Sequence, residues 1–257
     1  MPSTGTASFS RTRDQMIAAS LRVLRVLSDG ASPGTNDLTI CSEALNILLK
    51  QMMSTGLPLW CYQLLPIPMV AGQNTYTLGP APADVVCNRP LRMFEGSYIR
   101  TVCGTQTFDT QLRMISLLEY LQFGGKQTLS VPNSIMFMPL IDTGTPFAGG
   151  TTSPSTGHAA VQVYATPQDG TRTIYANMQR QIFDMTTGTD EFDLPVENFQ
   201  WLKYQLAAEV ADEYNVPEQR LARIEQKAKF YKDEMFAWSV ETVSMMMQPD
   251  QQVYQRR

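Results

Sequence analysis

Residues Asp193 to Trp238 read DLPVENFQWLKYQLAAEVADEYNVPEQRLARIEQKAKFYKDEMFAW, and this stretch contains two amphipathic helical patterns. Two further helical patterns stand near the beginning of the chain, with a long strand-rich stretch in between. Each amphipathic helix has an apolar stripe that it cannot bury alone. We therefore expect an α+β protein in which the N- and C-terminal helices form a helical bundle, with an inserted antiparallel β module.

The predicted domain boundaries follow these patterns. The β module covers residues 59–192, between two segments of the helical bundle, residues 12–58 and 193–243. A flexible arm over residues 1–11 and a C-terminal docking tail over residues 244–257 are expected to flank them, because both ends are polar and lack a regular apolar period.

The N-terminal helices have recognisable ends. The first is expected to begin near Thr12, which has capping-box spacing with Gln15, and to end at the turn sequence Asp29–Gly34. The second is expected from about Asp37 to Ser54, with Gly56 as its terminator. Both carry apolar residues at helical spacing on one face.

The C-terminal helices are expected to follow Pro195 and Pro217, because proline suits the first turn of a helix. Their apolar residues recur at helical spacing, which predicts packing rather than cofactor contacts. The first stripe is Phe199, Leu202, Leu206, Val210 and Tyr214, and the second is Leu221, Ile224, Ala228, Tyr231, Met235 and Trp238.

From Leu59 the apolar period changes to two, which predicts strands. The turn sequence AGQN after Met69 predicts a hairpin that ends with Tyr76 and Leu78. Further strands are expected over Met93–Val102, Ser134–Leu140, Ala159–Ala165 and Thr173–Phe183, the last two joined by the turn TPQDG. Together they predict an antiparallel sheet or a small sandwich.

Two segments interrupt these strands. Ile115–Phe123 is expected to form a short helix whose Ile115, Leu118 and Leu121 cover a sheet face. Residues 142–157 read DTGTPFAGGTTSPSTG, which is too rich in Gly, Ser, Thr and Pro to be core. We expect there an exposed loop, unusually long for a compact domain and therefore a candidate contact loop.

The composition limits the function. The formal net charge is −4 and the pI is about 5.1, which disfavours a protein whose main role is to neutralise phosphates, such as a DNA-binding regulator. No stretch approaches the roughly 18 to 20 apolar residues of a membrane span, and Met1–Arg13 lacks the apolar core of a signal peptide. We expect a soluble, cytoplasmic protein without a membrane partner.

The residues that carry most catalytic chemistry are sparse. The single histidine, His158, lies in a loop rich in Gly, Ser and Thr, so we expect a structural or exposed residue. The four cysteines lack metal-ligand spacing and are expected to be reduced thiols, with a single disulfide as the alternative. They are Cys41, Cys61, Cys87 and Cys103. No nucleotide-binding loop is present.

An acidic segment offers oxygen ligands for a hard cation such as calcium, but its spacing fits no calcium-loop pattern, which favours a solvated loop. The residues are Asp184, Asp190, Glu191 and Asp193. Paired carboxylates for sugar hydrolysis depend on separation in space, so a carbohydrate-binding or hydrolysing tail protein stays open as the alternative function. We expect no catalytic, cofactor or metal site, and hence no enzyme.

The C-terminal tail has two interpretations, a frayed helix end or a docking strap. Burying three methionines contributes about 5 to 9 kcal/mol. Ordering a dozen backbone residues costs about 12 to 24 kcal/mol. A docked tail therefore needs hydrogen bonds to a partner or support from neighbouring copies. Its candidate contact residues are Met245, Met246, Met247, Tyr254, Arg256 and Arg257.

Five segments, in this order, resemble the head-to-tail adaptors of short-tailed bacteriophages, also called head completion or tail tubular proteins. They are ALNILLKQMMSTGLPLW (44–60), AGQNTYTLG (71–79), LRMISLLEYLQF (112–123), VQVYATPQDGTRTIYANMQRQIFD (161–184) and LPVENFQWLKYQLAAEVADEYNVP (194–217). No single segment is diagnostic, but together they span most of the chain in the expected order.

The resemblance implies a structural virion protein at the head–tail junction, assembled in the host cytoplasm as a homo-oligomeric ring, expected to be a dodecamer. Such a connector binds the portal protein, docks the tail nozzle protein and serves genome packaging and DNA ejection. Double-stranded DNA passes through its channel without sequence-specific binding. Carried over to this chain, the portal-binding role falls to Ser244–Arg257, and the β module faces the tail.

Overall fold

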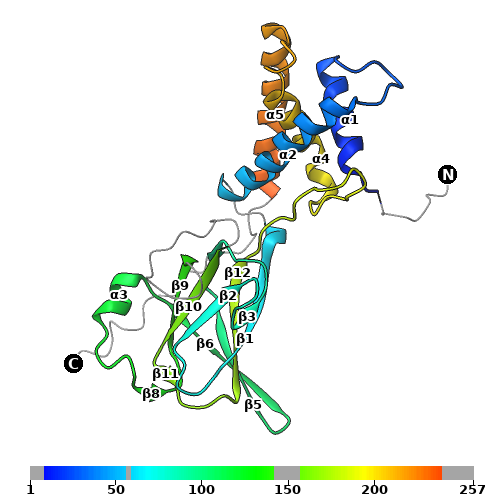
Figure 1. Ribbon diagram of the computed structural model, residues 1–257. Coiled ribbons are helices and arrows are strands. Elements are labelled where there is room, and N and C mark those ends of the chain that lie inside the picture. The colour runs from blue at the N-terminus through cyan, green and yellow to red at the C-terminus, as the bar shows by residue number, and fades with distance from the viewer. Residues whose placement is uncertain (1–8, 56–58, 142–156, 239–257) are drawn as a thin grey trace, which may run out of the picture.

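The computed structural model describes residues 9–55, 59–141 and 157–238 (Figure 1). Over these residues the chain is a mixed α and β protein with five α-helices and mainly antiparallel sheets. Figure 1 shows an elongated arrangement, with the N- and C-terminal helices gathered at one end and the β module at the other. The predicted loop, apart from Gly157, and the predicted docking tail lie outside the described residues.

The two N-terminal helices are α1 (Arg13–Leu24) and α2 (Thr35–Thr55). The predicted capping box of α1 is confirmed, since the Gln15 amide donates to Thr12 Oγ1 over 3.5 Å and the Thr12 amide to Gln15 Oε1 over 3.3 Å. The helix ends earlier than predicted, at Leu24. The next residue, Arg25, adopts a left-handed conformation with φ of 61° and closes the last turn.

The C-terminal helices are α4 (Phe199–Glu209), entered through a short 3-10 helix after Pro195, and α5 (Glu218–Trp238), entered after Pro217. Both predicted proline starts are confirmed. The stripe of α4 was predicted to continue through Tyr214, but the helix ends at Glu209 and turns follow it up to Asn215, whose φ is 50°.

One hydrophobic core joins helices from both ends of the chain. Ser20 of α1 reinforces this contact, because its hydroxyl donates to the carbonyl of Lys203 in α4 over 3.1 Å. Cys61, Ile182 and Met185, which flank the β module, also belong to this core. Its helical members include Met16, Ile17, Leu21, Leu45, Leu48, Leu49, Leu202, Leu206, Ile224 and Met235. Burial of this shared apolar surface stabilises the contact between the two chain ends.

The β module contains two five-stranded sheets. The first has the order β1-β12-β5-β6, with β4 also paired to β12, and the second has the order β3-β2-β10-β9-β7. In the first sheet the strands are β1 (Tyr62–Pro68), β12 (Arg172–Gln179), β5 (Tyr98–Cys103), β6 (Gln106–Gln111) and β4 (Arg92–Met93). In the second they are β3 (Val85–Val86), β2 (Thr75–Gly79), β10 (His158–Tyr164), β9 (Ser134–Ile141) and β7 (Arg113–Met114).

The longer pairings are antiparallel, and three two-residue pairings are parallel. One of the parallel pairs joins β8 (Leu129–Ser130) to β11 (Thr166–Pro167). The two large sheets share a second core, to which Ile99 and Ile174 come from the first sheet and Leu78 and Val161 from the second. The module is therefore a small sandwich, one of the two predicted forms.

One predicted strand connection is wrong. The stretch from Tyr62 to Leu78 is not a hairpin, because β1 pairs with β12 in the first sheet and β2 pairs with β10 in the second. The turn at Gly72, with φ of 78°, lets the chain cross between the sheets. TPQDG joins β10 to β12 as predicted; these two strands lie in different sheets, and Thr166 and Pro167 of the turn form β11.

The predicted short helix is present as α3 (Leu117–Gln122), capped by Ser116. Its predicted covering face is wrong in part, because Leu118 is 72% and Leu121 56% exposed. Ile115 is buried as predicted, together with Tyr120, against Met136 of β9. The large ring of Tyr120 covers the sheet, and Leu118 and Leu121 are therefore exposed to solvent.

Candidate interaction surfaces

The histidine predicted to be structural or exposed has a structural contact. His158 begins β10 and is nearly buried, and its Nε2 lies 2.8 Å from the carbonyl oxygen of Pro80. Its ring also packs against Gly79, where an added Cβ would lie 2.8 Å from His158 Cδ2. A ring fixed between backbone groups supports the sandwich and is poorly placed to act as a general base.

The four acids of the predicted acidic segment are bound by different partners. Asp184 pairs with Lys50 over 2.6 Å, and Asp193 pairs with both terminal nitrogens of Arg180. Asp190 accepts hydrogen bonds from the amides of Thr186 and Thr187, both of 2.7 Å, and Glu191 accepts one of 2.9 Å from Ser10. Within the described residues no cluster of three or more metal-ligating side chains occurs. The arrangement favours the solvated-loop interpretation.

The hydrogen bonds at Asp190 also set its charge state. Those from the side chain and amide of Thr187, and then from Thr186, lower the pKa of Asp190 to about 2. A carboxylate that accepts backbone hydrogen bonds is stabilised in its charged form. Asp190 therefore orders the turn before α4 rather than offering a proton or a free ligand.

All four cysteines are free thiols. Burial raises the pKa of Cys61 to about 11, and burial also raises the pKa values of Cys41 and Cys87. A neutral buried thiol is a weak nucleophile and a weak metal ligand. Cys103 is exposed at the end of β5. Cys41 and Cys61 therefore act as small apolar residues of the helical core, and Cys87 packs against the core of the sandwich.

The tail residues predicted to contact a partner lie outside the described residues. They are Met245, Met246, Met247, Tyr254, Arg256 and Arg257. The structure therefore neither brings them together nor separates them. Interaction surfaces that the structure does describe occur at the helical end, beside α3, and at the far end of the β module.

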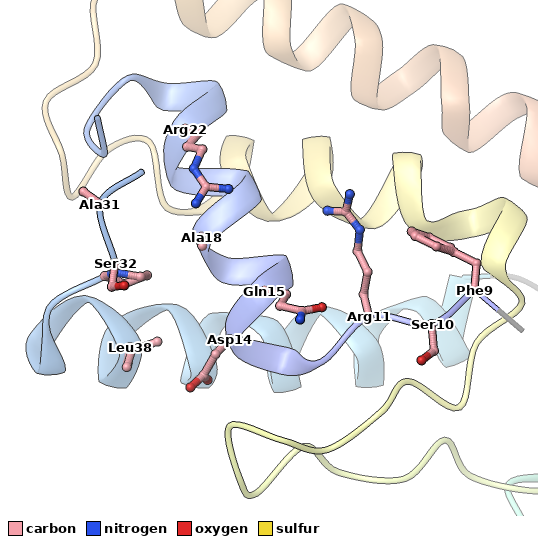
Figure 2. A pocket seen from close by; sticks show the side chains of 11 residues that line it. Phe9, Ser10, Arg11, Asp14, Gln15, Ala18, Arg22, Ala31, Ser32 and Leu38 are labelled. Carbon is pink, nitrogen blue, oxygen red and sulfur yellow. The ribbon is translucent and has the colours of Figure 1, made fainter. Parts of the chain in front are cut away.

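The helical end has an open cleft of about 580 Å³ along one face of α1 (Figure 2). Figure 2 shows Arg11 and Arg22 toward opposite ends of this face, with Gln15 and Ala18 between them. The carboxylate of Asp14, also in the cleft, is paired with Arg13 over 3.0 Å. Among the described residues, neither Arg11 nor Arg22 has a salt-bridge partner in the cleft lining, so the cleft suits polar or acidic groups of another molecule.

A second cationic surface lies on α4 and α5. The Lys203 and Lys227 ammonium groups lie 4.8 Å and 5.2 Å from the ring centre of Tyr204, which stacks on Tyr231. Burial lowers the pKa of Lys203, and the nearby charges of Arg11 and Lys227 lower it further. Arg11 lines the cleft and is close enough for its charge to act on Lys203, so the cleft and this cationic surface are neighbours. Such cation–aromatic contacts are common where proteins meet partners.

Exposed apolar side chains on α3 and on the segment that includes β8 offer a candidate contact surface. Leu118 and Leu121 are exposed on α3, and Leu129 and Val131 are exposed on the segment that includes β8. Exposed apolar residues that lie close in sequence are candidates for contact with another chain. This surface was not predicted, because both α3 leucines were expected to cover a sheet face.

The far end of the β module carries the hairpin of β5 and β6. In Figure 1 this hairpin projects away from the four helices. All six side chains of β6 are exposed, and no described segment pairs with its outer edge. Sequence analysis did not predict β6, since Phe108 is the only large apolar residue in QTFDTQ. Gly104, at the turn that precedes β6, is the sequence feature that could have indicated a hairpin here.

A charged and aromatic cluster stabilises the outer face of this hairpin. Arg100 donates two hydrogen bonds of 2.8 Å to Asp109 of β6, and these lower the pKa of Asp109. The same guanidinium lies 5.3 Å from the ring centre of Tyr98 and 4.8 Å from that of Tyr175, and the two rings stack. The hairpin is thus held in register although it projects beyond the sandwich.

Comparison with protein-family models and with curated proteins found no match to this chain. Among the described residues, no helix combines the length and the apolar character needed to span a bilayer.

Proposed function

We propose that this chain is a structural virion protein, a head-to-tail adaptor of a short-tailed phage. In this proposal a ring of copies binds the portal protein, extends the DNA channel and docks the tail nozzle. The observation that carries the proposal is the separation of the helical core and the unpaired strand edge at opposite ends of an elongated chain (Figure 1). A molecule with two distant contact surfaces is suited to joining two partners.

The finer arrangement belongs to the same proposal. The helices α1, α2, α4 and α5 form a bundle that packs copy against copy, expected in a dodecamer at the head–tail junction, after assembly in the host cytoplasm. Its support is the core that the helices share and the cationic side chains at their surface, Arg11, Arg22, Lys203 and Lys227. Many weak contacts between identical copies add up to a stable assembly through multivalency.

The proposal includes no turnover. His158 and the four acids of the acidic segment are engaged in structural contacts. A carbohydrate-hydrolysing protein would need two carboxylates that converge on one bond. The acidic net charge of −4 fits a channel through which double-stranded DNA slides without binding tightly to the wall.

The first experiment measures the mass of the purified full chain, alone and with purified portal protein, by light scattering after size exclusion. The proposal expects a ring, either alone or once portal is present. A chain that stays monomeric and does not bind portal overturns the proposal. Micromolar binding on a glycan array would favour the carbohydrate alternative.

The second experiment tests the role assigned to the tail. Deletion of residues 244–257 should abolish portal binding and leave the melting temperature nearly unchanged, because the truncated chain keeps every described residue of the two hydrophobic cores. The matched control replaces the same residues with a Gly/Ser sequence of equal length. Equal portal binding by the truncated and full-length chains would exclude the docking strap.

A further inference from the structure

We infer that the outer edge of β6 is a docking site for an extended strand of a second protein, which adds to the first sheet beside Thr107, Asp109 and Gln111. The inference deepens the proposed function and rests on it in one respect, since it takes the second protein to be the tail nozzle. The arguments for an added strand come from the edge itself.

The other sheet edges of the described residues are blocked or short. The edge strand β1 contains Pro66 and Pro68, and proline has no amide proton to donate to an added strand. The edge strands β3 and β7 have two residues each, and the part of β9 that β7 does not cover contains Pro139. By contrast, β6 has six residues and no proline, and Asp109, its one charged residue, is neutralised by Arg100. It therefore lacks the features by which proteins usually protect an edge.

The register shows which backbone groups of β6 are available. In an antiparallel pair, successive residues point their amide and carbonyl groups alternately toward and away from the partner strand. The amide of Leu112, directly after β6, donates to the carbonyl of Ser97, directly before β5, over 2.9 Å. Residues of even number therefore face β5. The backbone groups of Thr107, Asp109 and Gln111 face outward, which gives three donors and three acceptors.

The side chains define the chemistry of the added strand. Phe108 pairs with Thr101 and lies on the same sheet face as the buried Ile99, yet it is 53% exposed. β12 begins at Arg172, opposite Thr101, so Phe108 lies level with the end of β12 and the rest of the hairpin extends beyond it. A strand laid along β6 with one apolar side chain beside Phe108 and polar side chains beside Asp109 matches both faces.

The position of the hairpin favours the nozzle as the source of this strand. The hairpin lies at the end of the β module opposite to the four helices (Figure 1). A partner held there cannot also contact the helical end that the proposed function gives to neighbouring copies and the portal. Pairing between two β6 edges of different copies is the competing occupant, and the experiment separates the two.

The test compares two substitutions at one position. Thr107→Pro removes an outward donor and keeps the inward hydrogen bonds of β6, whereas the matched control Thr107→Ala keeps the donor and removes the same hydroxyl. Binding of full-length rings to the purified tail nozzle protein is measured by biolayer interferometry. We expect at least a tenfold loss of affinity for Thr107→Pro and less than a threefold change for Thr107→Ala, with portal binding equal in both.

A second measurement does not depend on a folded variant. Hydrogen exchange of wild-type rings, followed by mass spectrometry of a peptide that covers residues 105–112, should show three additional protected amides when nozzle protein is bound. Equal nozzle binding by both variants, or unchanged hydrogen exchange of residues 105–112 on nozzle binding, overturns the inference. If the variants still form rings and bind portal, the proposed function stands. Loss of self-association in Thr107→Pro, with nozzle binding intact, identifies a second copy as the occupant and also overturns the inference.

Discussion

The hydroxyl of Tyr214 donates a hydrogen bond of 2.8 Å to the carboxylate of Asp37, which lies 177 positions earlier in the chain. Asp37 also accepts a hydrogen bond of 3.1 Å from the amide of Gly34, just before α2. One carboxylate thus organises the start of α2 and attaches it to the turn after α4. Burial, and then the hydrogen bond to Asp37, raise the pKa of Tyr214, which keeps the hydroxyl protonated and able to donate.

Tyr214→Phe should destabilise the fold by about 1 kcal/mol, because it removes one hydrogen bond to a charged group and keeps the ring. The expected drop in melting temperature is about 2 to 4 °C for a chain of this size. Urea unfolding followed by circular dichroism measures the change. Tyr231→Phe is the control, since it removes a hydroxyl on α5 and keeps the stack with Tyr204. Equal stability of wild type and Tyr214→Phe would show that the bond between the chain ends is not stabilising.

The helices could be predicted because their signals are local. Thr12 and Gln15 cap α1 as their spacing indicated, and Pro217 stands where α5 begins. Helix ends were less predictable, since Arg25 is left-handed without being glycine or asparagine. The predicted buried face of α3 was wrong because six residues form less than two turns. The large ring of Tyr120 decides which side of the helix is buried.

Strand partners could not be predicted from alternation alone. The pattern located β1, β2, β10 and β12 correctly, but a short turn can return a chain to the same sheet or carry it to the opposite one. The edge strand β6 was missed because it is almost entirely polar. Its availability follows from pairing with β5 on one side alone, which is a property of the folded sandwich.

Arg180 and Asp193 join the end of β12 to the segment that leads into α4. The two groups are mostly buried, with side-chain exposures of 26% and 24%, and they form a double hydrogen bond. Arg180→Ala leaves the carboxylate of Asp193 without its partner and should cost about 1.5 to 3 kcal/mol. A double-mutant cycle with Asp193→Ala, measured by urea unfolding, should give a coupling of about 1 to 3 kcal/mol. Additive single effects would show that the pair does not hold the junction.

Gly79 is required by close packing. An added Cβ would lie 2.8 Å from His158 Cδ2 and 3.3 Å from His158 Cα, so the ring and the backbone must both move. Gly79→Ala should therefore destabilise the protein by about 1 to 3 kcal/mol. Gly124→Ala is the matched control, because no atom lies within 4 Å of its added Cβ. If the clash is the cause, the cost of Gly79→Ala in a His158→Ala background should fall by at least half, and an undiminished cost would assign the effect to another contact.

Asp190 gives a stability contribution with a defined pH dependence. Hydrogen bonds from Thr187 and Thr186 hold the pKa of Asp190 at about 2 in the folded chain, below the value of about 3.9 in an unfolded chain. A depressed pKa means that the contribution is present above about pH 4 and is lost as the pH falls toward 2. The melting temperature of Asp190→Ala should therefore be lower than that of wild type by a constant amount from pH 8 to 5, and the difference should shrink between about pH 4 and 2.

Differential scanning fluorimetry across this range measures the difference. Asp29→Ala, at an exposed carboxylate after α1 for which the described residues show no side-chain partner, should produce no comparable offset at any pH. A wild-type advantage over Asp190→Ala that stays constant down to pH 2 would mean that the carboxylate charge is not what the threonine amides stabilise. An advantage that fades on acidification shows instead that the turn before α4 depends on an ionised Asp190.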